Sequence, residues 1–110
     1  MYQFLLNIER HHVRVLSEAI RVQNKFISEL SGNIRNPPPI NAQATVQQRN
    51  LYLQQLLNDF TRYKNDFVIE LQAEWNRDFV NDDAREASLR DLMNRYEAEL
   101  IRIYAALNTL

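Results

Sequence analysis

The spacing of apolar residues constrains this chain more than any other feature of its sequence. Leucine, isoleucine, valine and aromatic residues recur at steps of three and four along most of the 110 residues. The pattern is interrupted at residues 32–43, around a run of three prolines, and again at residues 81–83. Because steps of three and four place side chains on one face of an α-helix, the sequence predicts an all-α protein with three long amphipathic helices.

The expected helices are bounded by residues that favour helix ends. They cover about residues 2–31, 45–80 and 83–109, with a proline-rich connector at residues 32–44. Gly32 suits the left-handed position that follows a helix C-terminus. Thr45 and Gln48 have the spacing of a capping box, in which each side chain bonds the main-chain amide of the other residue, and Asp83 and Glu86 repeat that spacing. We therefore place the starts of the second and third helices at Thr45 and Asp83.

The length of the chain suits one domain with a single core, and we expect residues 1–110 to form it. A straight continuation of the second helix into the third would leave about 70 Å of apolar stripe exposed, at a rise of ~1.5 Å per residue. The interruption at residues 81–83 is therefore expected to be a tight turn. The predicted architecture is an antiparallel, up-down-up helical bundle.

Composition narrows the functional classes. With 45% apolar residues, 25% charged residues and a net charge of -1, the chain has an ordinary soluble balance and no strong attraction to polyanions. The absence of cysteine excludes disulfides, thiolate metal sites and thiol nucleophiles and fits a reducing compartment, so we expect the cytoplasm. No stretch reaches the ~20 apolar residues of a membrane span, and the first residues lack the features of a signal peptide. We therefore expect no membrane partner.

Apolar residues cover about half of the circumference of the first helix, whereas a helix packed on one side needs an arc of only about 100°. One face carries Leu5, Ile8, Leu16, Ala19, Ile20, Phe26, Ile27 and Leu30, and the wider arc adds Phe4, Leu6, Val13, Val15 and Val22. A smaller apolar group lies on the back of the third helix, at Ala98, Ile101 and Ala105. Because this surface exceeds what three helices can bury among themselves, we expect self-association, most simply as a symmetric dimer.

A basic stripe lies on the first helix, opposite its apolar face. It consists of Arg10, Arg14, Ser17, Arg21 and Lys25, and Arg35 continues the same angle beyond the helix end. The stripe is roughly 20 to 25 Å long, which suits contacts with phosphates along duplex RNA or DNA. The simpler alternative, which we prefer, is a solvated face or a face that meets the acidic residues of the second helix, Asp59, Asp66, Glu70 and Glu74.

Two polar residues interrupt the apolar arc at the spacing found in di-iron helical bundles. Glu9 and His12 have this Glu-x-x-His spacing, but the chain contains only two histidines, so one chain cannot complete such a site. We expect neither a metal nor another cofactor. Glu9, His12 and Gln23 are instead predicted to form a polar layer in the core or in an interface, where it fixes the register of the helices.

The remaining residues favour binding over catalysis. The serines have no plausible general base apart from the two adjacent histidines, and a single glycine cannot form a phosphate-binding loop, so we expect neither an enzyme nor a small-molecule substrate. We expect an adaptor, chaperone-like or assembly module that binds another protein by helix packing, with Phe67, Trp75 and Phe79 as core or anchor residues. The alternative is a duplex RNA-binding or DNA-binding protein that uses the basic stripe.

Overall fold

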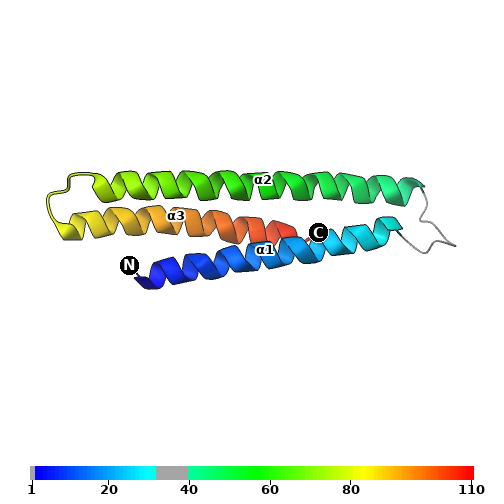
Figure 1. Ribbon diagram of the computed structural model, residues 1–110, viewed down its shortest axis with the longest axis horizontal. Helices are drawn as coiled ribbons and strands as arrows, with labels where there is room; N and C mark the ends of the chain where they lie inside the picture. Colours follow the sequence, from blue (N-terminus) through cyan, green and yellow to red (C-terminus); the bar gives the residue numbers. More distant parts are fainter. Residues whose placement is uncertain (1, 32–39) are drawn as a thin grey trace.

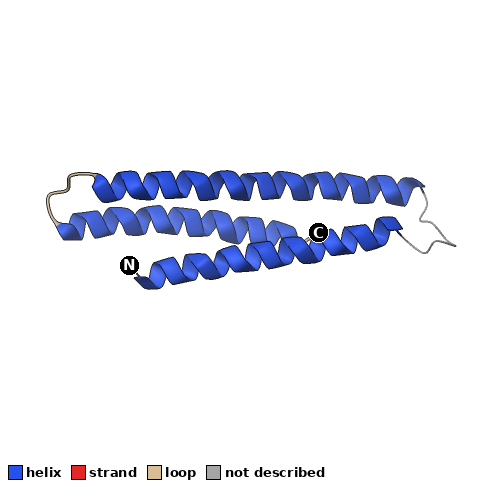
Figure 2. Cartoon of the chain, in the orientation of Figure 1, coloured by secondary structure: helices blue, strands red, loops and turns tan. Residues whose placement is uncertain are grey.

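The computed structural model describes residues 2–31 and 40–110, which form three α-helices. α1 spans Tyr2–Ser31, α2 spans Ile40–Asn76 and α3 spans Asp82–Asn108. Figure 1 shows the helices side by side, with α2 antiparallel to both α1 and α3, and Figure 2 shows only helices and loops in the described ranges. Each helix contacts the other two. The predicted all-α, up-down-up bundle is confirmed, and it forms a rod with principal extents of 69 × 20 × 16 Å.

The second helix begins earlier than predicted. α2 starts at Ile40, directly after the last proline, so residues 40–44 are helical and do not belong to a connector. Residues 40–44 contain neither glycine nor proline, and nothing in their sequence stops the helix from extending back to the prolines. Thr45 therefore lies inside α2, and its predicted role as the N-cap is wrong. The rest of the predicted connector, with Gly32 and the prolines, lies outside the described residues.

The turn between α2 and α3 is confirmed, but its limits differ from the prediction. α2 ends at Asn76 rather than near Val80. The N-cap of α3 is Asn81, whose extended backbone lets its side-chain oxygen accept a hydrogen bond from the amide of Ala84 at 2.8 Å. Such a cap stabilises a helix by about 1 kcal/mol. The predicted capping box at Asp83 is wrong, because Asp83 already lies in the first helical turn.

The buried residues of α2 and α3 form two regular rows. α3 buries Leu89, Leu92, Met93, Tyr96, Leu100, Ile103 and Leu107, and α2 buries Val46, Leu53, Leu56, Phe60 and Phe67. Spacings built from steps of three, four and seven keep each row on one side of its helix, so the rows meet along a common axis. Full removal of such a side chain from water stabilises the fold by about 1.5 to 3 kcal/mol.

The broad apolar arc of α1 divides into two rows. The buried row consists of Ile8, His12, Val15, Ala19, Val22 and Phe26. The second row, which we call the outer row, consists of Val13, Leu16, Ile20, Ile27 and Leu30, with exposed fractions of 59%, 45%, 58%, 61% and 36%. Most outer-row residues follow a buried residue by one position, which turns them about 100° around the helix. α1 thus packs on both other helices and still leaves an apolar row uncovered.

Exposed apolar surface of this kind does not make α1 a membrane span. No helix within residues 2–31 and 40–110 has a stretch long and apolar enough to cross a membrane. Each outer-row residue is separated from the next by polar or buried positions, so the row is a narrow line along one side of the helix.

A pair of substitutions on α3 tests the buried row. Leu100 is fully buried and its neighbour Ile101 is 48% exposed. We expect Leu100→Ala to lower the free energy of unfolding by about 2 to 5 kcal/mol, because it leaves a cavity in the core. The control Ile101→Ala should change it by less than about 1 kcal/mol. Urea denaturation followed by circular dichroism measures both, and equal losses would contradict the assignment of the buried row.

Candidate functional site

Four rings from all three helices meet inside the bundle, and we call them the ring cluster. His12 of α1 lies with its ring centroid 5.7 Å from that of Phe60 on α2 and 5.5 Å from that of Tyr96 on α3, both in edge-on orientation. Phe67 of α2 stacks on Tyr96 with centroids 4.2 Å apart and planes 12° apart. Offset and edge-on ring pairs stabilise a core beyond the effect of their buried area. The ring cluster therefore ties the three helices together at one level.

A buried hydrogen bond lies within the ring cluster. The Nε2 atom of His12 lies 2.5 Å from the hydroxyl oxygen of Tyr96, a residue 84 positions away in the chain. The other ring nitrogen, Nδ1, is buried without a hydrogen-bond partner and lies 3.5 Å from a carboxylate oxygen of Glu9. The assignment that fits these contacts has the Tyr96 hydroxyl donating to Nε2, while Nδ1 carries the ring proton and faces Glu9.

Burial decides the protonation of this pair. Burial lowers the pKa of His12, the carboxylate of Glu9 acts in the opposite direction, and electrostatic interactions with Lys64 and His11 lower the pKa further. Burial also raises the pKa of the Tyr96 phenol, and Glu9 adds to that effect. Both groups are therefore uncharged at neutral pH, as a buried hydrogen-bonded pair requires. This arrangement suits a structural link between α1 and α3 rather than proton transfer to a substrate.

The predicted polar layer forms only in part. His12 lies in the core, but the side chain of Glu9 is 73% exposed and Gln23 is half-buried, so the three residues do not form a layer in the core of one chain. A role of Glu9 and Gln23 in an interface stays a prediction. The partner that sequence reasoning missed is Tyr96, which shares its apolar row with leucines. A buried tyrosine needs a partner for its hydroxyl, and this need is the signal that points to a histidine on another helix. Within the described residues, no three His, Asp or Glu side chains form a group that could hold a metal ion.

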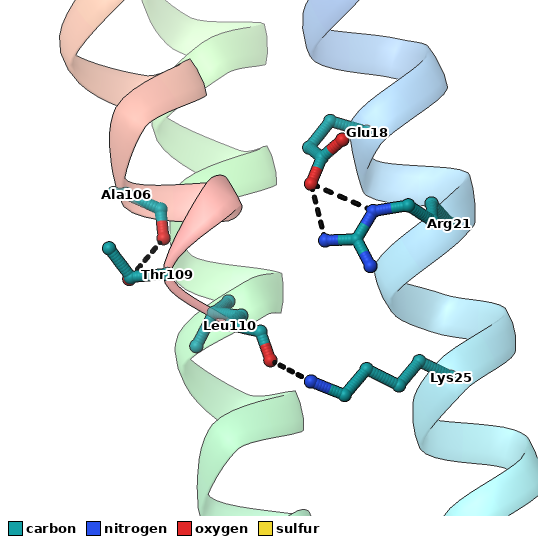
Figure 3. A network of polar contacts seen from close by, with 6 residues as sticks. All are labelled: Glu18, Arg21, Lys25, Ala106, Thr109 and Leu110. Atoms are coloured by element: carbon teal, nitrogen blue, oxygen red, sulfur yellow. Dashed lines mark hydrogen bonds and ion pairs between the residues drawn. The ribbon is translucent and has the colours of Figure 1, made fainter.

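Two cations of the basic stripe have partners on α3 or just beyond its end. The guanidinium of Arg14 lies 4.5 Å from the ring centroid of Tyr104, a cation–π contact. Lys25 donates from Nζ to the main-chain oxygen of Leu110 at 2.7 Å, as Figure 3 shows. These contacts join α1 to the C-terminal end of α3.

The rest of the basic stripe lies at the surface. Arg21 donates from Nε to Glu18 on its own helix at 2.9 Å (Figure 3). Arg10 and Ser17 are exposed, and Arg35 lies outside the described residues. For the part of the stripe that the structure describes, the alternative in which it meets the acidic residues of α2 is wrong. Its contacts are with Tyr104 of α3, with Leu110 and with Glu18 of α1 itself. Whether the stripe binds phosphates stays a prediction.

The three predicted anchor residues lie in different environments. Phe67 is buried in the ring cluster, whereas Trp75 is 58% exposed, so the interpretation of Trp75 as a core residue is wrong. Phe79 is half-buried and lies beyond the end of α2. Each step of four residues advances about 40° beyond a full turn, so the run from Phe67 through Leu71 to Trp75 rotates away from the buried side. The role of Trp75 as an interface anchor stays a prediction.

Trp75 borders an apolar cavity at this end of the bundle, which we call the end cavity. Its volume is about 360 Å³, and its lining residues are Leu5, Leu71, Gln72, Trp75, Asn76, Leu89 and Met93, from all three helices. The guanidinium of Arg85 lies 5.9 Å from the centroid of the Trp75 ring and 5.8 Å from that of Phe79. Arg85, which also pairs with Asp82 at 3.2 Å, thus links the end of α2 to the start of α3.

The outer row of α1 has a nearly uncharged border. The edge away from the core carries Arg10, Ser17, Asn24 and Ser31, which follow one another at steps of seven residues. Gln23 fills the interval between Ile20 and Ile27. Serine, asparagine and glutamine side chains both donate and accept hydrogen bonds. An apolar centre with such a polar rim is typical of a protein–protein interface.

The pH dependence of stability tests the buried histidine. The unfolded chain protonates His12 near pH 6.5, whereas the folded chain does so only at lower pH. Unfolding then takes up a proton between these values, so the free energy of unfolding should fall as the pH falls below about 6.5. We expect His12→Gln to remove much of this fall between about pH 7 and pH 5, as measured by urea denaturation.

The control for this experiment is His11→Gln. His11 is half-buried, lies 3.6 Å from Glu97 and is no part of the ring cluster, so the variant should keep most of the fall in stability that His12 causes. A natural chain with the same stability at both pH values would contradict the argument.

Substitutions in the basic stripe separate internal contacts from phosphate binding. We expect the double variant with Arg14→Gln and Lys25→Gln to lose about 1 to 2 kcal/mol of stability, because it removes the contacts with Tyr104 and Leu110. Arg10→Gln is the control and should leave stability unchanged. Unchanged stability of the double variant, together with loss of salt-dependent binding to random duplex RNA, would assign the stripe to phosphate binding.

Comparison of the chain with known protein families, with curated proteins and with solved structures finds no match. The arrangement of three helices does not specify a function, because helical bundles serve many unrelated functions. The chemistry of the surface is therefore what indicates a function.

Proposed function

We propose that this protein is a non-enzymatic helical interaction module, of the adaptor, chaperone-like or assembly type, which binds a protein partner by helix packing through the outer row of α1. The observation that supports this proposal is the continuity of that row. Five aliphatic side chains, each more than a third exposed, lie along one side of a single helix from Val13 to Leu30. The row is about 26 Å long at ~1.5 Å per residue, which matches the length of a docked partner helix of ordinary size.

Burial of the outer row contributes free energy to association. Complete burial of one such side chain contributes about 1.5 to 3 kcal/mol, so covering the part that is still exposed contributes roughly 1 kcal/mol per residue, or about 5 kcal/mol for the row. A partner helix adds a similar amount from its own apolar face. Association costs about 4 to 15 kcal/mol in lost freedom of motion. The combined gain of about 10 kcal/mol lies within this range of costs, which suits a reversible contact rather than a permanent one.

The other exposed apolar residues do not form such a row. They lie singly or as adjacent pairs, at Leu5 near the start of α1, at Leu51, Tyr52, Val68, Ile69 and Trp75 on α2, at Val80 in the turn and at Ile101 on α3. Scattered apolar residues are normal on a soluble surface. The end cavity is the one further feature that we include in the proposal, because its apolar lining and Trp75 offer a place for one anchoring side chain of a partner.

Catalysis is not part of the proposal. Within the described residues no serine hydroxyl bonds to a histidine ring, and the hydroxyl of Ser88 donates instead to Glu74 at 2.6 Å. The buried His12 is held by Tyr96. We also propose the cytoplasm as the location, since a chain without cysteine is suited to a reducing compartment.

Capture experiments with matched variants test the proposal. The bait with Ile20→Lys and Ile27→Lys places two cations in the outer row, and we expect it to lose the protein that the natural chain captures from a lysate. The control bait carries Ile69→Lys on α2, where the isoleucine is 65% exposed, and should retain that protein. The captured protein, once purified, should bind the natural chain directly. Protein and nucleic acid are scored separately.

Three outcomes are informative. Loss of a protein from the outer-row bait alone supports the proposal. Equal capture by both baits would refute it. Salt-sensitive capture of nucleic acid that survives the outer-row substitutions and disappears on substitution of the basic stripe would favour the duplex-binding alternative.

A further inference from the structure

We infer that the helix that covers the outer row is α1 of a second copy of this chain, packed antiparallel about a two-fold axis near the middle of the row. This inference rests on the proposed function, because it names the partner of the same surface. Three observations support it: the spacing of the outer-row residues, the charges at the two ends of the outer row and the length of the contact.

The spacing of the outer-row residues is similar when α1 is read in either direction. When two antiparallel helices pack along residues spaced by three and four, the residue numbers of each facing pair add up to the same sum. With a sum of 43, Val13 lies opposite Leu30 of the second copy, Leu16 lies opposite its Ile27, and Ile20 lies opposite its Gln23. Each layer then contains at least one aliphatic side chain, and four of the six layers contain two. A two-fold axis requires a surface that is self-complementary in this way.

The border of the row is also compatible with a second copy. In the same register, Ser17 lies beside Asn24 of the second copy, and these side chains can exchange hydrogen bonds. Arg10, the one charged residue of this border, lies beside Ser31 in the last turn of the other α1. That turn contains no basic residue, and the negative end of a helix dipole attracts a cation.

Charge disfavours the parallel arrangement. A parallel pair brings equivalent residues to the same level, so Glu9 would face Glu9 of the second copy next to the first apolar layer. Like charges in that position are destabilising. The antiparallel pair separates the two Glu9 side chains by more than the length of the outer row.

The internal contacts of the basic stripe keep two of its cations out of the proposed dimer contact. Arg14 and Lys25 are held against α3 by Tyr104 and Leu110, on the side of α1 away from the outer row. The two copies of α1 can therefore approach without placing these cations in the contact.

The size of the contact sets the strength of the dimer. One helix face of roughly 26 Å is small compared with the ~800 Å² per partner of a standard stable interface. We therefore expect a dimer that dissociates on dilution and exchanges its subunits readily.

Disulfide trapping tests the register. The chain has no cysteine, so one substitution introduces one thiol. We expect a mixture of Leu16→Cys and Ile27→Cys chains to form a disulfide-linked dimer under mild oxidation, because these positions face each other. Neither variant alone should do so, since like positions are offset by about 16 Å and a disulfide needs Cα atoms within about 7 Å. Ile69→Cys is the control for random collision. Linkage of each variant with itself would indicate a parallel pair and overturn the inference.

Sedimentation of the full chain tests the dimer itself. We expect the apparent mass to rise from one copy to two with concentration. Ile20→Lys should keep the chain monomeric, and Ile69→Lys should not. If the natural chain stays monomeric at the highest soluble concentration, the inference is wrong. The proposed function still stands in that case, provided that the outer-row bait has lost a different protein. If the outer-row substitutions change neither mass nor capture, both are wrong.

Discussion

The structure depends on the fact that α1 carries two apolar rows and the bundle buries only one. The buried row meets the rows of α2 and α3, and this contact folds the three amphipathic helices into one rod. The outer row lies about 100° away around the same helix, so the other two helices cannot cover it. Apolar surface left outside a core is what binding surfaces are made from. The same geometry therefore stabilises the fold and provides the proposed docking surface.

The ring cluster fixes how the buried rows align. Aliphatic rows with similar spacing can slide past one another by a turn without losing much buried area, whereas a buried polar group must keep its partner. His12 on α1 finds the hydroxyl of Tyr96 on α3 only in one alignment of the two helices. Phe60 and Phe67 extend the same level to α2. The charged contacts at the surface, such as those of Arg14 and Lys25, then act on helices that the core has already aligned.

The number and order of the helices could be predicted from the sequence, because apolar periodicity and prolines are local signals. The exact helix ends could not be predicted, because they depend on competition between neighbouring cap residues. Thr45 has a capping pattern, yet the helix extends past it to the prolines. Asn81 caps α3 in place of Asp83, since its backbone is extended where the chain turns. The sequence also could not show which of the two apolar rows of α1 is buried in the bundle. Periodicity gives the width of an apolar arc, and only the other helices decide which half of it becomes core.

Two adjacent residues of α1 allow the most direct measurement. Val15 belongs to the buried row with no exposed surface, and Leu16 belongs to the outer row with 45% of its surface exposed. We expect Val15→Lys to prevent folding or to lower the free energy of unfolding by several kcal/mol, because it buries an unpaired charge. Leu16→Lys should change the free energy of unfolding by less than about 1 kcal/mol. Urea denaturation followed by circular dichroism measures both at a concentration where the chain is monomeric. Similar losses in the two variants would contradict the division of α1 into a row that folds the chain and a row that does not.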